Sequence, residues 1–149
     1  MNLNDVRLIR LNTNEDPRGK LTAIEGNNDV SFEIKRIFYI SDVTEGVVRG
    51  GHAHRETDQL ALAVSGTVRI LVSDGTDSRQ VILDDSSTGL LLPRMTWTSL
   101  TDFSQGAVCL VLASTHYDRS RSLRDWDSYL EARKLPKIAE FTGGPVLYK

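Results

Sequence analysis

The chain is organised around the segment Gly46-Val-Val-Arg49-Gly-Gly-His52-Ala-His54-Arg-Glu-Thr-Asp-Gln59-Leu-Ala-Leu-Ala-Val-Ser-Gly66. Its two histidines are two positions apart, so in an extended strand both imidazoles project from the same face. The alternation of Leu60, Leu62 and Val64 with smaller residues supports that extended conformation. Two imidazoles on one face of a sheet form either half of a metal site or an acid/base pair. The function depends on which of the two this segment forms.

Outward from this segment, short apolar stretches alternate with turn signals such as Asp16-Pro17-Arg18-Gly19 and Asp74-Gly75. At 149 residues the chain fits one domain. The spacing of the strands predicts an all-β sandwich or barrel. We expect strands near residues 6–11, 21–25, 32–42, 60–65, 68–72, 80–83, 88–92, 95–101 and 107–113.

The end of the chain changes character. Ser122-Leu-Arg-Asp125 resembles a capping box, and Leu123, Trp126 and Leu130 recur at helical spacing. This pattern predicts a short C-terminal helix that packs its tryptophan face onto the barrel. We expect a domain over residues 1–134 and an irregular tail over residues 135–149.

Composition excludes several classes of function. The net charge of −2 gives no electrostatic argument for binding nucleic acid or an anionic membrane, so an anionic ligand would need a local arginine cluster. The single cysteine, Cys109, lies in an apolar run and is expected to be a buried thiol. We find no apolar run of membrane-spanning length and no signal-peptide core at the N-terminus, and predict a cytoplasmic location.

The spacing G-x5-H-x-H-x4-Q-x6-G resembles the first cupin motif, with Gln59 in place of the usual glutamate. Gly89, Pro93 and Asp102 fall near positions of the second motif, and Thr98 stands where its histidine belongs. The resemblance implies a single cupin barrel, that is, a double-stranded β-helix or jelly roll. Two imidazoles and an amide oxygen provide less nitrogen and anionic oxygen than divalent first-row metals need. We therefore expect no metal and no cofactor, and assign the histidines to proton transfer.

Several short segments together resemble the dTDP-sugar 3,4-ketoisomerase family of small cupins, over about residues 12–130. They are Asp16-Pro-Arg-Gly-Lys-Leu-Thr-Ala-Ile-Glu25, Phe32-Glu-Ile-Lys-Arg-Ile-Phe-Tyr-Ile40, Arg49-Gly-Gly-His-Ala-His54, Val111-Leu-Ala-Ser114 and Tyr117-Asp118. The resemblance implies metal-independent movement of the ketone of a dTDP-4-keto-6-deoxyhexose from C4 to C3 through an enediol, in deoxyaminosugar biosynthesis. It also implies a homodimer that exchanges N-terminal strands.

Residue chemistry fits this reaction, because an imidazole can take and return a proton within one turnover. We assign His52 as the base at carbon and His54 as its partner, with the order of the two left open. A guanidinium binds a pyrophosphate or a developing oxyanion through two parallel hydrogen bonds. The candidates for that role are Arg18, Arg36 and Arg49.

Strand parity bears on two of these arginines. Arg36 shares the inward face of its strand. Arg49 has the opposite parity to His52 in a regular strand, but a bulge at Gly50-Gly51 would break the alternation. Trp97 and Tyr117 are candidates to stack on thymine or cap the pocket, with core packing as the alternative.

Two departures from the family pattern concern catalysis and specificity. Phe38-Tyr39 stands where the family commonly has a Tyr-Tyr pair with one catalytic hydroxyl, and Trp97-Thr98-Ser99 stands where Trp-His-Glu is usual. Parity places Phe38 inward and Tyr39 outward, so we expect the inward face of this strand to lack the catalytic phenol, and Tyr39 is the remaining candidate for a catalytic hydroxyl. Alternative functions are a 3,5-epimerase of the related nucleotide-sugar cupins and a non-catalytic sugar-binding cupin. The exact sugar, the nucleotide base and the C4 configuration do not follow from the sequence.

Overall fold

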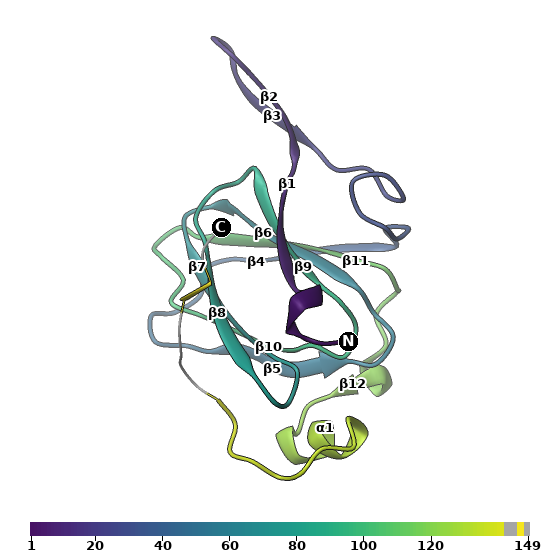
Figure 1. Cartoon of the computed structure of the whole chain (residues 1–149). Helices are drawn as coiled ribbons and strands as arrows, with labels where there is room; N and C mark the ends of the chain where they lie inside the picture. The colour runs from purple at the N-terminus through teal and green to yellow at the C-terminus, as the bar shows by residue number, and fades with distance from the viewer. Residues whose placement is uncertain (142–145, 148–149) are drawn as a thin grey trace.

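The structure is a computed structural model that describes residues 1–141 and 146–147. Two β-sheets face each other across the core, as Figure 1 shows. The five-stranded sheet has the order β1 (Arg7–Arg10), β9 (Thr88–Leu92), β6 (Gln59–Ser65), β11 (Val108–Ala113) and β4 (Arg36–Ile40). The six-stranded sheet has the order β12 (Ser122–Leu123), β5 (Arg49–His54), β10 (Trp97–Thr101), β7 (Val68–Ser73), β8 (Ser78–Leu83) and β13 (Val146–Leu147). The predicted all-β, jelly-roll architecture is confirmed.

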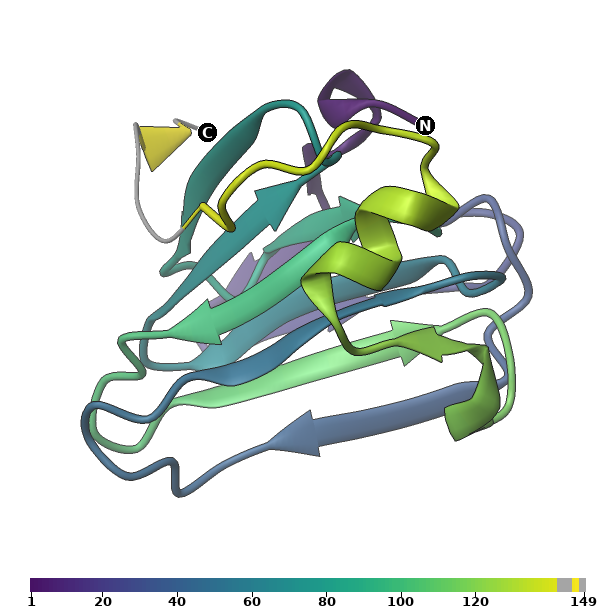
Figure 2. The same cartoon turned by 90° about the horizontal axis from the view of Figure 1, so that it is seen from below.

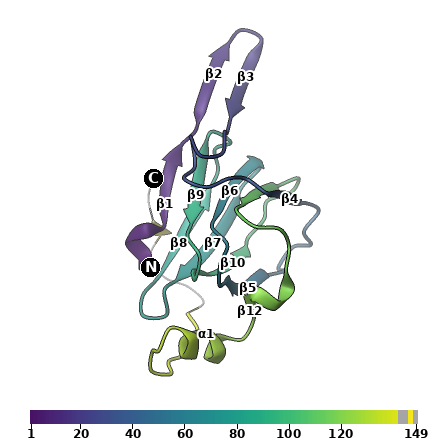
Figure 3. The same cartoon turned by 90° about the vertical axis from the view of Figure 1, so that its right-hand side faces the viewer.

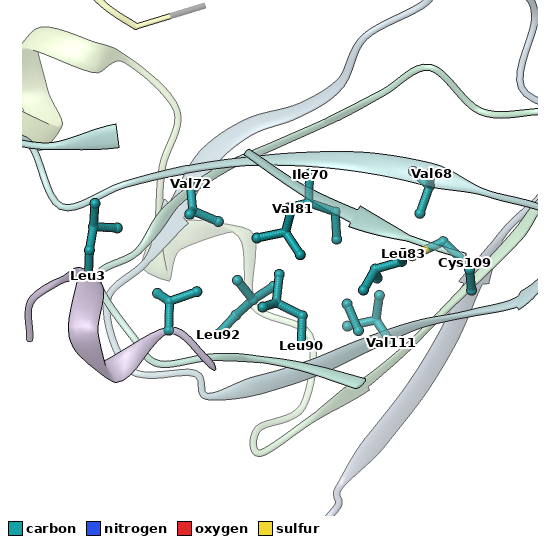
Figure 4. Packing of buried hydrophobic residues seen from close by; sticks show 13 residues of the cluster. Leu3, Val68, Ile70, Val72, Val81, Leu83, Leu90, Leu92, Cys109 and Val111 are labelled. Atoms are coloured by element: carbon teal, nitrogen blue, oxygen red, sulfur yellow. The ribbon is translucent and has the colours of Figure 1, made fainter. Parts of the chain in front are cut away.

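The core lies between the sheets, where alternate side chains of each strand turn inward. Figure 4 shows the β7 and β8 side chains facing those of β9 and β11. Burial of this apolar surface is the main stabilising contribution to the fold. The predicted buried thiol is also found here, since Cys109 is fully buried in the cluster. The buried residues of this cluster are Leu3, Val6, Ala61, Ala63, Val68, Ile70, Val72, Val81, Leu83, Leu90, Leu92, Cys109 and Val111.

A second apolar cluster covers the outer face of the five-stranded sheet. Val30 and Phe32 pack there against side chains of β6 and β11. The strand predicted over residues 32–42 is therefore shorter than expected and begins only at Arg36. The physical reason is that Phe32 is buried in this outer cluster, so the chain becomes a strand of the sheet only after it.

The chain between β1 and this outer cluster forms a hairpin that projects away from the barrel (Figures 1 and 3). Its strands are β2 (Asn12–Asp16) and β3 (Gly19–Ala23), which among the described residues pair only with each other. The predicted turn lies at its tip, where the Asp16 carboxylate accepts a hydrogen bond from the Arg18 backbone N–H at 2.8 Å. A short 3-10 helix, η1 (Leu3–Asp5), precedes β1 and buries Leu3 in the core.

The predicted C-terminal helix is α1 (Trp126–Ala132), which lies beside β5 and β12 (Figure 2). Its predicted start was wrong. The N-cap is Asp125, which accepts a hydrogen bond from the Ser128 N–H at 2.9 Å. Ser122 cannot cap this helix, because it pairs with His54 as part of β12. As expected, Trp126 packs onto the barrel through Trp97, with ring centroids 5.3 Å apart.

The tail after this helix is only partly irregular. Residues 135–141 form neither helix nor strand. The other short helix of this region, the 3-10 helix η2 (Arg119–Arg121), lies before α1 and precedes β12. Val146–Leu147, however, form β13, which pairs in parallel with β8. The remainder of the predicted tail, residues 142–145 and 148–149, lies outside the described residues. Among the helices of the described residues, none has the length and apolar character needed to cross a membrane.

Candidate active site

A cavity of about 490 Å³ lies inside the barrel and is lined by residues from both sheets. Its apolar wall includes Ala61, Ile70, Leu92 and Val111, which also belong to the hydrophobic core. Its polar lining comprises Arg36, Arg49, His52, His54, Gln59, Thr98 and Arg124. The cavity is therefore a continuation of the core in which imidazole and guanidinium groups replace apolar side chains.

A β-bulge in β5 shapes one wall of this cavity. Thr98 of β10 pairs with His52, but the next residue, Ser99, pairs with Gly50, so Gly51 is the extra residue. Both glycines have left-handed φ angles, +85° at Gly50 and +74° at Gly51. Glycine is needed at position 50 for a second reason, because a Cβ there would lie 2.8 Å from the Thr98 carbonyl oxygen. The close contact and the left-handed backbone conformation therefore both require glycine at position 50.

The bulge changes which side of β5 each residue faces. Arg49 and His52 are three positions apart, yet both line the cavity together with His54. The sequence prediction that Gly50-Gly51 breaks the alternation here agrees with this geometry. The six residues of β5, Arg49–His54, consequently place two imidazoles and one guanidinium group in the same cavity.

The two imidazoles are in direct contact. Their ring centroids are 4.9 Å apart and the rings are tilted by 77°. The Nδ1 atom of His54 lies 3.3 Å from the hydroxyl oxygen of Ser122, which faces it across the β5–β12 pair. Ser122 is therefore a hydrogen-bond partner of His54 Nδ1, with the donor set by the tautomer of the imidazole.

Both histidines favour the neutral form. Burial lowers the pKa of His52, and the positive charge of Arg124 lowers it further, while a hydrogen bond involving the Gly50 backbone opposes the shift. Burial, followed by the charges of His52, Arg124 and Arg36, lowers the pKa of His54 to about 4. At neutral pH His54 is therefore a proton acceptor or a neutral donor, and the near-neutral pKa expected from free imidazole does not apply to it.

Arg36 is held between two aromatic rings. Its guanidinium carbon lies 4.5 Å from the Phe38 ring centroid and 4.7 Å from that of Tyr117. Parity places Arg36 and Phe38 on the cavity side, as predicted. The absence of a hydroxyl at position 38 therefore leaves an apolar ring that supports a cation, and Tyr117 joins the site through the same contact.

Arg124 is a site residue that sequence reasoning missed. It lines the cavity and is close enough to both histidines to lower their pKa values. It lies two residues after Ser122, in the segment interpreted as a helix cap. The signal that identifies it is the pairing of Ser122 with His54, and that pairing is visible only in the folded chain.

Three other predicted residues are not brought inside the cavity. Tyr39 contributes to the cavity rim, but its side chain is 68% exposed on the outer face of β4. Trp97 packs against Trp126 and Tyr129, which favours the structural role considered for it. Arg18 lies at the tip of the projecting hairpin, where it is 89% exposed and paired with Asp16.

The side chains beside the two histidines are the ones that the sequence places at the cupin ligand positions. Gln59 and Thr98 line the cavity beside His52 and His54. Within residues 1–141 and 146–147, no group of three or more histidine, cysteine, aspartate or glutamate side chains is positioned to hold a metal ion. Metal independence stays a prediction that rests on the weakness of amide and hydroxyl donors.

Comparison with known proteins gives one consistent result. Residues 4–134 match the protein family described as FdtA: WxcM-like, C-terminal. The TDP-4-oxo-6-deoxy-alpha-D-glucose-3,4-oxoisomerase of Aneurinibacillus thermoaerophilus is 37% identical over 114 residues, which cover 76% of this chain and 82% of that protein.

Two solved structures extend this similarity to the fold. The sugar 3,4-ketoisomerase QdtA from Thermoanaerobacterium thermosaccharolyticum, in complex with TDP, superposes with a TM-score of 0.86 at 36% identity, covering 89% of this chain and 96% of that one. A 3,4-ketoisomerase from Helicobacter canadensis gives 0.85 at 35% identity, covering 87% and 98%.

The close contact at the bulge predicts that Gly50→Ala is far more damaging than Gly46→Ala. Both positions have left-handed φ angles, +85° and +82°, so both variants lose roughly 1 kcal/mol to backbone strain. Only at Gly50 does the added Cβ also displace the Thr98 carbonyl, since nothing lies within 4 Å of a Cβ at Gly46. Denaturant unfolding should show a larger loss of unfolding free energy for Gly50→Ala than for Gly46→Ala. Equal losses would contradict the proposed role of the contact.

The buried histidines predict that stability falls in mild acid. The folded pKa of His54, about 4, is below its unfolded value of about 6.5, so the unfolded chain binds more protons between these values. Its contribution is complete above pH 6.5 and is lost as the pH falls toward 4, to a total of roughly 3 kcal/mol. The slope of unfolding free energy against pH should flatten in His54→Asn. An NMR titration of His54 with a midpoint near 6.5 would contradict the assignment.

Proposed function

Because the chain belongs to the FdtA family of WxcM-like proteins, we propose that it is an isomerase that moves the ketone of a TDP-linked 4-keto-6-deoxyhexose from C4 to C3. The observation that carries this proposal is the convergence of two half-buried imidazoles and three guanidinium groups on one cavity. The reaction needs a base for a carbon acid, partners for oxygen protons and cations for a diphosphate. The cavity presents each of these groups.

The proton transfers follow from the placement of the histidines. His52, with its lowered pKa, is unprotonated at neutral pH and is our candidate to remove the proton from C3. Delivery of a proton to O4 then gives an enediol, and return of the proton from His52 to C4, with loss of a proton from O3, gives the 3-ketone. His54 contacts His52 and is our candidate for the oxygen protons.

The cations account for an anionic ligand on an acidic chain. The net charge is −2, yet Arg36, Arg49 and Arg124 line one cavity. Guanidinium groups bind phosphate oxygens through two parallel hydrogen bonds, and the clamp of Phe38 and Tyr117 holds Arg36 in one orientation. We assign these arginines to the diphosphate and to the negative charge that develops on the enediolate.

The relatives favour this function over the alternatives raised by the sequence. A 3,5-epimerase would exchange protons at C3 and C5, whereas the proposed isomerase exchanges them at C3 and C4. A sugar-binding cupin without activity would exchange neither. The location of deuterium in the sugar after incubation in D2O therefore distinguishes all three functions.

We propose further that the chain forms a homodimer through its N-terminal region. Within the part of the chain that the structure describes, the β2–β3 hairpin pairs with no other strand, and an isolated two-stranded hairpin is only marginally stable in water. Leu21 on this hairpin is 62% exposed, which supports burial against a partner. Because β1 pairs with β9 of its own chain, the hairpin is the segment available for exchange. Sedimentation velocity tests this, and a monomer at micromolar concentration would contradict it.

The cytoplasm remains our predicted location, in keeping with a nucleotide-linked substrate.

His52→Asn is expected to abolish carbon chemistry while leaving ligand binding intact. Loss of a positioned base should lower turnover by ~100-fold or more. Deuterium uptake at C3 and C4, followed by NMR in D2O, should disappear, while TDP still binds with its wild-type affinity. His54→Asn should slow turnover but leave some exchange at C3, because the base is still present. Wild-type exchange in His52→Asn would show that the base lies elsewhere.

Exhaustive chelation is expected to leave activity unchanged. The reason is the donor set beside the histidines, in which Gln59 and Thr98 offer only neutral oxygens. The measurement is turnover before and after removal of metals, with elemental analysis of the treated protein as the control. Loss of activity on chelation, followed by recovery with iron, manganese or zinc, would overturn the assignment of the histidines to proton transfer.

A further inference from the structure

His54 separates two cavities of different size. Besides the large cavity, a small one of about 10 Å³ adjoins it at His54, and four residues line both: Arg36, His54, Gln59 and Tyr117. A space of this size accommodates about one water molecule. The imidazole of His54 thus has the substrate cavity on one side and room for a single water on the other.

The lining of the small cavity is rich in hydrogen-bonding groups. Thr57 and Thr115 approach each other there with 2.6 Å between their hydroxyl oxygens, and Ser122 contributes a third hydroxyl. Thr57 is 8% exposed and Gln59 is 9% exposed, so these groups lie away from bulk solvent. A buried water needs two to four polar partners, and this lining offers more than that.

Beyond these groups the small cavity reaches the protein surface. His116, Asp118 and Arg121 also line it, and all three are exposed. Arg121 pairs with Asp118 at 3.2 Å and with Glu56 at 3.3 Å, so surface ion pairs form its outer wall. A proton in the small cavity can therefore exchange with solvent through these exposed groups.

Ser122 connects His54 to this space. Its hydroxyl oxygen lies 3.3 Å from Nδ1 of His54, and the backbone register of β5 and β12 places the two residues directly opposite each other. In an imidazole the second nitrogen, Nε2, points away from Nδ1. With Nδ1 at Ser122, Nε2 is the nitrogen left for the substrate cavity.

We propose that Ser122 and a single water in the small cavity form a proton relay that connects His54 to solvent behind the substrate. This inference deepens the proposed isomerase function and rests on it. The route serves the oxygen protons of the reaction, whereas the carbon proton stays with His52. Ser122 is in this scheme a positioning and relay residue that acts through His54.

The relay is balanced over one turnover. In the first half, Nε2–H of His54 gives its proton to O4 as the enediol forms, Nδ1 takes the proton of the Ser122 hydroxyl, and the water returns one to Ser122 and is reprotonated from solvent. In the second half, Nε2 takes the proton from O3, Nδ1–H returns its proton to Ser122, and one proton leaves through the water. His54 changes tautomer twice and stays neutral at both stages.

The charges around His54 favour this neutral route over an imidazolium intermediate. His52, Arg36 and Arg124 face it from the substrate cavity, and Arg121 and Asp118 lie across the small cavity. The first three lower its pKa in addition to burial, so a second proton on the ring is disfavoured. A neutral imidazole that donates from one nitrogen must then accept at the other, and Ser122 is the group in reach.

The test compares Ser122→Ala with Ser122→Thr, which keeps a hydroxyl at the same position. Ser122→Ala should lower kcat by about 10- to 100-fold with KM unchanged, which is at or below the lower end of the roughly 100- to 10,000-fold contribution of a positioned acid or base, because Ser122 acts through His54. Oxygen proton transfer should then limit the rate, so the D2O isotope effect on kcat rises and the isotope effect of a C3-deuterated substrate falls. Ser122→Thr should stay within a few-fold of the wild type in all four quantities.

Two kinetic results with the Ser122 variants would overturn the relay. One is a Ser122→Ala variant that matches Ser122→Thr in kcat and both isotope effects. The other is a loss of kcat accompanied by a higher KM and a larger C3-deuterium isotope effect, which indicates a misplaced histidine. Thr57→Val, which removes a hydroxyl from the small cavity at nearly constant shape, should reproduce the Ser122→Ala pattern more weakly, and wild-type kinetics in it would also count against the relay.

A measurement without substrate separates this inference from the proposed function. In protein labelled with ¹⁵N-histidine, Ser122→Ala should change the tautomer populations of His54 and leave those of His52 unchanged. Failure of the wild type to convert the TDP-linked 4-keto sugar would refute the isomerase function, whatever the tautomers show. Unchanged His54 tautomers in Ser122→Ala would refute the relay, whatever the activity.

Discussion

The contact between the backbone of Gly50 and the carbonyl of Thr98 is the constraint on which the site depends. It admits no Cβ, and it holds β5 in a left-handed conformation next to a second left-handed glycine. The resulting bulge shifts the pairing of β5 with β10 by one residue. Without it, Arg49 would point to the opposite side of the strand from the histidines. One cation and two bases share a cavity because two glycines interrupt a regular alternation.

The barrel supplies the surroundings that give these groups their chemistry. Ile70 and Val111 belong to the hydrophobic core and also line the cavity, so the half-buried imidazoles share the cavity with apolar side chains. Burial is the largest cause of the lowered pKa of His52 and of His54. The same packing that stabilises the fold therefore keeps the bases unprotonated at neutral pH. In the proposed mechanism, stability and proton transfer therefore depend on the same apolar side chains.

A second effect comes from the arrangement of cations. The chain as a whole carries a small negative charge, so in the proposed function the attraction of a nucleotide diphosphate is assigned to Arg36, Arg49 and Arg124 at the cavity. Two of these three also lower the pKa of His54. A bound diphosphate would offset that charge, which links occupation of the anion site to the protonation of the base beside it.

The sequence by itself determined the all-β class, the shared face of His52 and His54, the inward parity of Arg36 and Phe38, and the buried thiol. These features follow from alternation along single strands, which is a local property. Tertiary structure decided what depends on the partner of each strand. Ser122 and Arg124 reach the histidines because β12 pairs with β5, although the segment reads as a helix cap. Phe32 leaves the expected strand because it packs in a cluster formed by β6 and β11. Trp97 joins the helix cluster and Arg18 the hairpin tip for the same reason, since spacing along a chain does not specify which distant side chains it will meet.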